Sequence, residues 1–253
     1  MLRQLLVSVG QLVLPAHCAA CGAAAPPELR MPLCRRCSRA LAVLMAAPYC
    51  PLCGRRAGPH TVDAQGCMFC RRYPVRFDGA VRVGPYEDLL RTLILRCKRH
   101  RRVEIGPHLG RLLAERAAAA PWADLVDEVV PVPLHWGRRV RRGFNQAVVL
   151  AQTVAGALVA ARPRRARPRL RRTRPTPHQA NLSAAQRPRN VRGAFAVRGR
   201  AGDLAGKRVL LVDDVMTSGT TIAECTRTLL RAGADAVYVA VVATADYDDP
   251  GPW

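Results

Sequence analysis

The chain has 253 residues, of which 40 are Lys or Arg and 18 are Asp or Glu, so its formal net charge is +22 at pH 7. This length allows one or two domains with a sizeable core. The positive charge predicts a polyanionic partner, with nucleic acid as the first candidate, although solvated surface arginines would give the same composition. No stretch approaches the roughly 18 uninterrupted apolar residues of a membrane span, so the sequence predicts no such span. We expect a cytoplasmic protein.

The first seventeen residues are apolar enough to be weighed as an export signal. Their positively charged region is weak, however, and no small-x-small cleavage site precedes Cys18. Leu5, Leu12 and Val13 share a helical face with Val9. We therefore expect a short amphipathic helix that packs on the body of the protein.

Eight of the ten cysteines form four C-x-x-C pairs, separated by twelve, twelve and thirteen residues. A C-x-x-C turn directs two thiolates at one ion, and two such turns complete the tetrahedral shell of Zn²⁺. Redox-active dithiols would instead predict a single pair in a βαβ unit. We therefore expect two structural zinc sites, with the pairs combined in sequence or in a crossed arrangement. The ligands would be Cys18, Cys21, Cys34, Cys37, Cys50, Cys53, Cys67 and Cys70.

The composition changes near residue 75, where we place the boundary between an N-terminal helix and zinc region (1–75) and a main domain (76–253). In the main domain a strand ending at Pro85 is predicted first. Two helices, Asp88–His100 and Pro107–Ala120, follow it. The first ends in a basic run that contains Lys98. Such a run is usually a solvated face, but it could also contact phosphates.

A strand at Asp127–Val132 leads into a turn, then into four arginines, and then into a helix that runs to Ala161. This order of elements predicts an anion site, because arginine side chains bind pyrophosphate oxygens with two parallel hydrogen bonds. A surface loop with solvated arginines is the alternative. The arginines are Arg138, Arg139, Arg141 and Arg142.

Residues 162–192 form a second arginine-rich stretch, interrupted by prolines. Proline and like charge oppose a compact regular element, so we expect a mobile loop or ribbon. It could act as a lid over a bound ligand or as a track for nucleic-acid phosphates. The absence of aromatic residues for base stacking argues against a dedicated single-strand platform.

The stretch Val209–Thr221 combines four apolar residues, two adjacent carboxylates and a Thr/Ser/Gly loop that opens a helix. The apolar run predicts a strand buried on both faces of a parallel sheet, and ligands bind at the carboxyl ends of such strands. The loop predicts a phosphate site, and the carboxylates suit paired ribose hydroxyls. We therefore predict a ribose-phosphate site at Asp213, Asp214, Val215, Met216, Thr217, Ser218, Gly219, Thr220 and Thr221. The segment Val237–Thr244 predicts a last buried strand.

This stretch resembles the phosphoribosyl pyrophosphate (PRPP) motif of type I phosphoribosyltransferases. The whole chain is similar to the ComF family, through its four cysteine pairs, VPVPLHWGRRVRRGFNQA, TPHQANLSAAQRPRNVRGAF and VLLVDDVMTSGTT. The resemblance implies an α/β fold, with a mostly parallel sheet flanked by helices and a small N-terminal double zinc ribbon. It also implies that Asp213 and Asp214 hold the ribose, and that Arg138, Arg142, Asn145 and Gln146 lie at or near the pyrophosphate.

The resemblance further implies a role in natural competence, in which the protein would bind PRPP with magnesium and assist single-stranded DNA entering the cytoplasm. The DNA-uptake machinery would then be a partner. A phosphoribosyltransferase reaction with an acceptor that the sequence does not identify is the enzymatic interpretation. Two alternatives remain open, namely a salvage transferase that acts on a free base, and a DNA-binding module that senses PRPP without catalysis.

Overall fold

The computed structural model describes residues 17–25, 33–58, 60–73, 75–99, 102, 104–134, 143–158, 166–176, 186–200 and 202–245. The expected N-terminal helix, Arg138 and Arg142 lie outside these residues, as does much of the 162–192 stretch. Within the described residues, no helix is long and apolar enough to cross a membrane.

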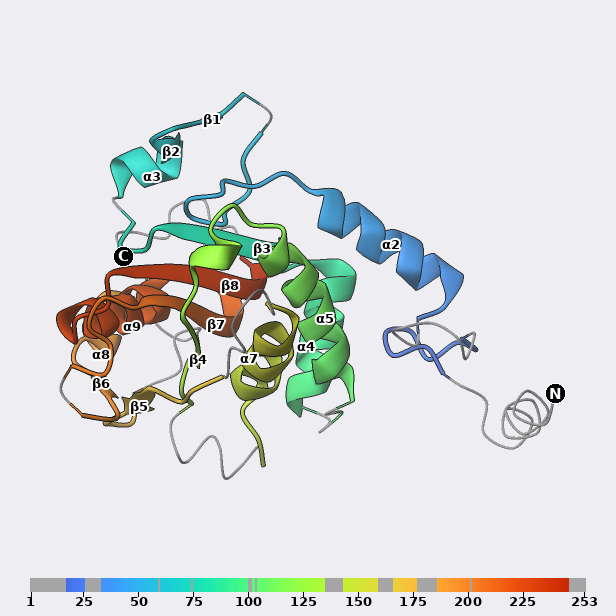
Figure 1. Ribbon diagram of the computed structural model, residues 1–253. Coiled ribbons are helices and arrows are strands. Elements are labelled where there is room, and N and C mark those ends of the chain that lie inside the picture. Colours follow the sequence, from blue (N-terminus) through green and yellow to red (C-terminus); the bar gives the residue numbers. More distant parts are fainter. Residues whose placement is uncertain are drawn as a thin grey trace.

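A parallel four-stranded sheet forms the centre of the molecule, in the order β3-β8-β7-β4 (Figure 1). Its strands are β3 (Gly79–Pro85), β4 (Glu128–Pro131), β7 (Arg208–Met216) and β8 (Ala236–Thr244). All three neighbouring pairs are parallel. The prediction of a mostly parallel sheet is therefore confirmed.

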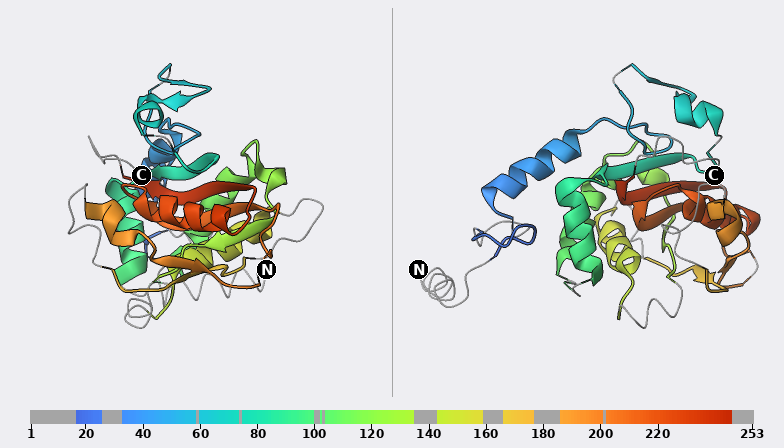
Figure 2. Two further views of the ribbon diagram at one scale, coloured as in Figure 1. Left: turned by 90° about the vertical axis from the view of Figure 1, so that its left-hand side faces the viewer. Right: turned by 180° about the vertical axis from the view of Figure 1, so that it is seen from behind.

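Helices cover both faces of this sheet, as Figures 1 and 2 show. On one face lie α4 (Asp88–Arg99), α5 (Ile105–Ala118) and α7 (Gln146–Ala157). On the other face lies α9 (Thr220–Arg231), with α8 (Gln186–Val191) beside it.

Successive residues of each strand pack into opposite cores, because side chains alternate across a strand. In β7, Leu210 and Val212 belong to the core under α5 and α7, whereas Val209 and Leu211 belong to the core under α9. All four side chains are fully buried. Burying an aliphatic side chain of this size stabilises the fold by about 1.5–3 kcal/mol, which explains why the run is apolar at every position.

The cysteine-rich region contributes α2 (Arg35–Ala46), the short strands β1 (Val62–Asp63) and β2 (Gly66–Cys67), and α3 (Met68–Arg72). Helix α2 was not predicted from the sequence, although Cys37 and Leu41 lie four residues apart and are both buried. This helix packs beside β3 and α4. The α3 end of the region lies over the β3 side of the sheet (Figure 1).

The arginine-rich stretch contains more regular structure than the sequence indicates. Strand β5 (Leu170–Arg172) pairs antiparallel with β6 (Phe195–Val197) to form a two-stranded ribbon. Helix α8 also lies inside the stretch for which we expected a loop or ribbon. The ribbon forms because Leu170 and Phe195 are buried in the core on the α9 face of the sheet. The like charges at neighbouring positions do not prevent this burial.

Candidate functional site

The two adjacent carboxylates lie inside strand β7 rather than after it. The strand continues to Met216, and its last residues pair with the end of β8 up to Met216 and Thr244. Asp213 and Asp214 therefore sit near the carboxyl edge of the sheet, on the strand that leads directly into the candidate phosphate loop. This is the edge at which ligands of open parallel sheets bind.

The loop between β7 and α9 is very short. Gly219 precedes the first residue of α9 and has φ 86°, a left-handed conformation that favours glycine. The Ser218 and Thr220 hydroxyls lie 3.1 Å apart, and both residues are buried. The start of a helix attracts anions through its N–H groups and its dipole, so the phosphate site that the sequence predicts would lie here.

Lys98, at the end of α4, contacts one of the two carboxylates. Its Nζ donates a hydrogen bond of 2.7 Å to Oδ1 of Asp214, and the two side chains are only 18% and 16% exposed. Burial raises the pKa of Asp213 to about 7; the charge of Asp214 adds to this effect, and the charge of Lys98 opposes it. A pair of carboxylates in this setting favours a bound cation or hydroxyl groups.

Two residues assigned by resemblance to the pyrophosphate side lie at the start of α7. The Asn145 amide caps this helix, because Oδ1 accepts from the Ala147 N–H at 3.1 Å and Nδ2 donates to the Val132 carbonyl at 3.1 Å. Gln146 is 3% exposed, and its side-chain N and O atoms have no hydrogen-bond partner among the described residues. It lines a cavity of about 10 Å³ together with Asp214.

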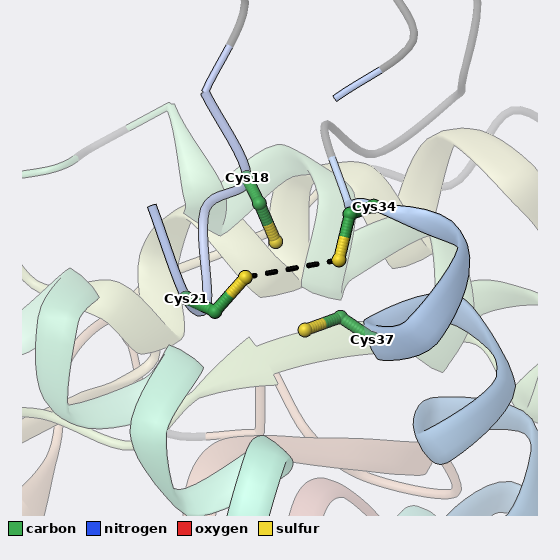
Figure 3. Close-up of side chains that lie close together, drawn as sticks. All are labelled: Cys18, Cys21, Cys34 and Cys37. Carbon is green, nitrogen blue, oxygen red and sulfur yellow. Dashed lines mark hydrogen bonds between the residues drawn. The ribbon is translucent and has the colours of Figure 1, made fainter. Parts of the chain in front are cut away.

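The eight cysteines form two tetrads in sequential order. In each tetrad the four Sγ atoms lie within 4.8 Å of one another. Figure 3 shows the first tetrad, in which Cys18, Cys21, Cys34 and Cys37 point toward one another. The second tetrad consists of Cys50, Cys53, Cys67 and Cys70. The crossed arrangement is therefore not observed.

The sulfur geometry fits zinc. The measured Sγ–Sγ distances include 3.7 Å for Cys21–Cys34 and 3.6 Å for Cys53–Cys67. A tetrahedral site with Zn–S bonds of about 2.3 Å requires about 3.8 Å between sulfurs. Burial raises the pKa of Cys18, but backbone N–H groups of Cys34 and Cys21 outweigh it and lower the pKa to about 6. Cys18 can therefore supply one thiolate to a metal, whereas burial and the neighbouring thiols raise the pKa of Cys37 in the same tetrad.

A residue next to the second tetrad contacts the candidate phosphate loop. Arg55, two residues after Cys53, donates from Nη2 to the carbonyl oxygens of Thr217 and Ser218 at 3.3 and 3.4 Å. Arg55 was not among the predicted site residues. A chain with 40 Lys and Arg residues gives no signal that distinguishes one arginine beside a cysteine pair.

The arginines that the structure describes between residues 166 and 200 include two groups. Arg169 bonds Glu128 and Asp203, and Arg172 bonds Thr176, so these side chains hold the ribbon to the sheet or to itself. Other arginines of the ribbon and its flanks are exposed; they are Arg167, Arg171, Arg174, Arg192, Arg198 and Arg200.

Comparisons with known proteins identify a domain in the C-terminal part of the chain and relatives along most of its length. Residues 141–251 match the phosphoribosyl transferase domain. The chain is 36% identical over 241 residues to the DNA utilization protein YhgH of Salmonella typhi, covering 90% of this chain and 96% of that protein. It is 32% identical over 214 residues to the competence protein F of Haemophilus influenzae, covering 82% of this chain and 88% of that protein.

Solved structures resemble the chain more weakly. The allosteric regulatory enzyme of purine biosynthesis is 26% identical over 54% of this chain and 25% of its own, with a TM-score of 0.36. A TM-score this low contributes nothing to the assignment. The sequence relatives, the phosphoribosyl transferase domain and the paired cysteine tetrads together show that the chain belongs to the ComF family of competence-related proteins with a phosphoribosyltransferase domain.

Proposed function

We propose that this protein binds PRPP at the end of strand β7 and transfers its phosphoribosyl group to an acceptor. One observation carries the proposal. Two adjacent carboxylates on β7 run directly into a short loop and the start of α9, at the carboxyl edge of a parallel sheet and inside the matched phosphoribosyl transferase domain. The 5′-phosphate would occupy the loop Thr217–Thr221, and the ribose hydroxyls would donate hydrogen bonds to Asp213 and Asp214.

The reaction would break the bond between ribose C1 and the pyrophosphate oxygen and form a bond between C1 and the acceptor. Pyrophosphate leaves with the electron pair, and the acceptor loses a proton. Asp213 and Asp214 would stabilise positive charge that develops on the ribose ring. Their oxygen donors suit Mg²⁺, and the chemistry that this ion supplies when it accompanies PRPP is neutralisation of the pyrophosphate. Gln146, which is buried and lines a small cavity with Asp214, would lie toward the pyrophosphate, together with Arg138 and Arg142.

Turnover is tested by pyrophosphate release from PRPP and Mg²⁺, with free bases, nucleotides and single-stranded DNA as acceptors. We expect release that depends on one acceptor class and that falls at least about 100-fold in Asp214→Asn, the scale of one electrostatic interaction removed from a transition state. The matched control is Asp235→Asn, since Asp235 is exposed and precedes β8 at the opposite edge of the sheet. Release with a free base would favour the salvage alternative. Tight PRPP binding without any release would favour the sensing module.

Single-stranded DNA is proposed as the partner because exposed arginines gather on the ribbon β5–β6 and its flanks. Binding to phosphates releases counterions, so affinity should fall steeply with salt. In a gel shift, the triple change of Arg167, Arg171 and Arg198 to Ala should weaken binding and reduce the salt slope by about one for each arginine that binds a phosphate. Arg169 stays intact because it is part of an ion-pair cluster.

The control for DNA binding is the triple change of Arg35, Arg36 and Arg39 to Ala. It removes the same charge from the exposed side of α2. Equal weakening by both triple variants would contradict a specific role for the ribbon, since it would indicate that only net charge matters.

A further inference from the structure

Arg55 joins the second cysteine tetrad to the candidate phosphate loop. The residue is 5% exposed, and its Nη2 lies 3.3 Å from the Thr217 carbonyl oxygen and 3.4 Å from that of Ser218. More than 160 residues separate the two segments in the chain. The contact therefore arises only because the tetrad is docked on the main sheet.

The tetrad itself fixes the position of the Arg55 side chain. The backbone around it folds into a tight turn, in which the Cys50 N–H donates to the Arg55 carbonyl at 2.8 Å and the Gly54 N–H donates to the Cys50 carbonyl at 2.7 Å. The guanidinium lies 4.1 Å from the centre of the Phe69 ring, a cation–π contact. Phe69 immediately precedes Cys70. Both contacts that hold Arg55, the backbone turn at Cys50 and the ring of Phe69, therefore belong to segments that carry cysteines of the second tetrad.

Close packing holds this turn against the sheet. Gly54 has φ 75°, and a Cβ atom there would lie 3.3 Å from Cε of Met216, the last residue of β7. The Thr244 hydroxyl donates to the Gly54 carbonyl at 3.0 Å, and the Ala80 N–H donates to the Pro51 carbonyl at 2.7 Å. The turn is therefore anchored to β3, β7 and β8 at once.

The hydrogen bonds of Arg55 determine how two peptide units of the loop are oriented. In a trans peptide the C=O and N–H groups point in opposite directions. Fixing the Thr217 carbonyl therefore aims the Ser218 N–H away from Arg55, and fixing the Ser218 carbonyl does the same for the Gly219 N–H. Consecutive N–H groups aligned in this way form an anion-binding concavity.

We propose that Arg55 is a positioning residue for the phosphate loop, through which the second zinc site controls the loop's affinity for the 5′-phosphate of a ribose phosphate. This role rests on the proposed function. Arg55 does not touch the ligand; it orients the peptide units that do. The four thiolates of the second tetrad fit zinc, and they hold the turn that carries Arg55.

The role is tested on the full-length, zinc-loaded protein with Arg55→Met, Arg55→Lys and the neighbouring control Arg56→Met. Arg56 is exposed and pairs with Glu87 at 2.9 Å. Calorimetry with Mg²⁺ measures the Kd of PRPP, ribose 5-phosphate and inorganic pyrophosphate. For Arg55→Met we expect about tenfold weaker binding of both ribose phosphates, the scale of one charge-assisted hydrogen bond. Pyrophosphate should bind as in the wild type, Arg55→Lys should be intermediate, and Arg56→Met should be unchanged.

Zinc content and hydrogen exchange of the loop amides are measured on the same samples. A positioning role predicts full zinc content with faster exchange at residues 217–221 in Arg55→Met. Should Arg55→Met lose zinc, the comparison of Arg55→Lys with Arg56→Met decides instead. Wild-type-like binding and exchange in a zinc-loaded Arg55 variant would overturn the role of Arg55 alone. A wild-type protein that binds none of the three probes would overturn the proposed function, and this role with it.

Discussion

Lys98 Nζ lies 2.7 Å from Asp214 Oδ1 and so joins the end of helix α4 to the carboxyl edge of strand β7. The contact places one positive charge beside two adjacent carboxylates that are both partly buried. The two cysteine tetrads lie on different sides of this site. The first tetrad packs on the helix that carries Lys98, through a hydrogen bond of 3.1 Å from Arg96 to the Ala19 carbonyl, and the second contacts the loop through Arg55.

The first prediction concerns the ionisation of Asp213. Burial and the charge of Asp214 raise its pKa from 3.8 to about 7, whereas Lys98 lowers it. The native state therefore holds this proton more tightly than the unfolded chain, and the free energy of unfolding should fall as pH rises from about 4 through 7. In Lys98→Met the pKa should be higher, so the fall should extend to higher pH. Denaturant titrations across this range measure it.

The double variant Lys98→Met, Asp213→Asn is the control for this assignment, because it lacks the titrating carboxyl. The free energy of unfolding of the double variant should not fall with rising pH as that of Lys98→Met does. A pH profile that is the same in the single and double variants would mean that another group titrates in this window.

The second prediction concerns the buried cluster around Glu128. Arg169 bonds both Glu128 oxygens, at 2.8 and 3.0 Å, and Lys207 Nζ lies 2.5 Å from Oε1. The Glu128 side chain is 6% exposed. Glu128→Gln would remove the buried carboxylate charge that Arg169 and the partly exposed Lys207 share, while Arg169 keeps its contact with Asp203. Breaking a buried ion pair costs up to about 3–5 kcal/mol in unfolding free energy. Glu87→Gln, in an exposed pair with Arg56, should cost at most about 1 kcal/mol.

The Glu128 cluster should also make stability depend on acid. Burial raises the pKa of Glu128, but the hydrogen bonds from Arg169 and Lys207 outweigh it, so the pKa is lowered overall. The stability that ionised Glu128 contributes is therefore fully present above the usual glutamate pKa and is lost as pH falls through the lowered pKa of the folded state. Urea titrations of both variants at neutral and acidic pH test this; equal losses for Glu128→Gln and Glu87→Gln would contradict the buried cluster.

The third prediction concerns metal content. Two tetrads of four thiolates predict two Zn²⁺ ions per chain, measurable by elemental analysis of the purified protein. Cys21→Ser and Cys67→Ser should each retain about one ion, because each variant disrupts a different tetrad. A single variant that lost both ions, or a folded wild-type protein without zinc, would be inconsistent with two independent sites.

The sequence predicted the parts of this structure that depend on local pattern. Val209–Val212 reads as a doubly buried strand because every residue is apolar, and the spacing of the cysteines indicates zinc directly. The continuation of β7 through Asp213 to Met216 was not predicted, because carboxylates rarely occupy a central strand. Here Asp213–Met216 remain in the strand because they pair with Val241–Thr244 of β8, a long-range pairing that the local sequence does not reveal.

The contacts of Lys98 and Arg55 could not be predicted in the same way. They bridge 116 and more than 160 residues, and neither has a spacing signature. Because the chain has so many arginines, the sequence does not show which few cations contact the site. Lys98 offered a weak signal, as the lysine within an arginine-rich helix end, whereas Arg55 offered none. The packing of segments that lie far apart in the chain decides both contacts.

The central claim is that the end of β7 and its loop bind the ribose phosphate of PRPP. It is tested most directly by calorimetric titration of PRPP with Mg²⁺ into the wild-type protein, Asp214→Asn and the control Asp235→Asn. We predict saturable binding of one PRPP per chain, weakened about tenfold or more in Asp214→Asn and unchanged in Asp235→Asn. Wild-type protein that does not bind PRPP, or an Asp214→Asn variant that binds it as tightly as the wild type, would contradict the account.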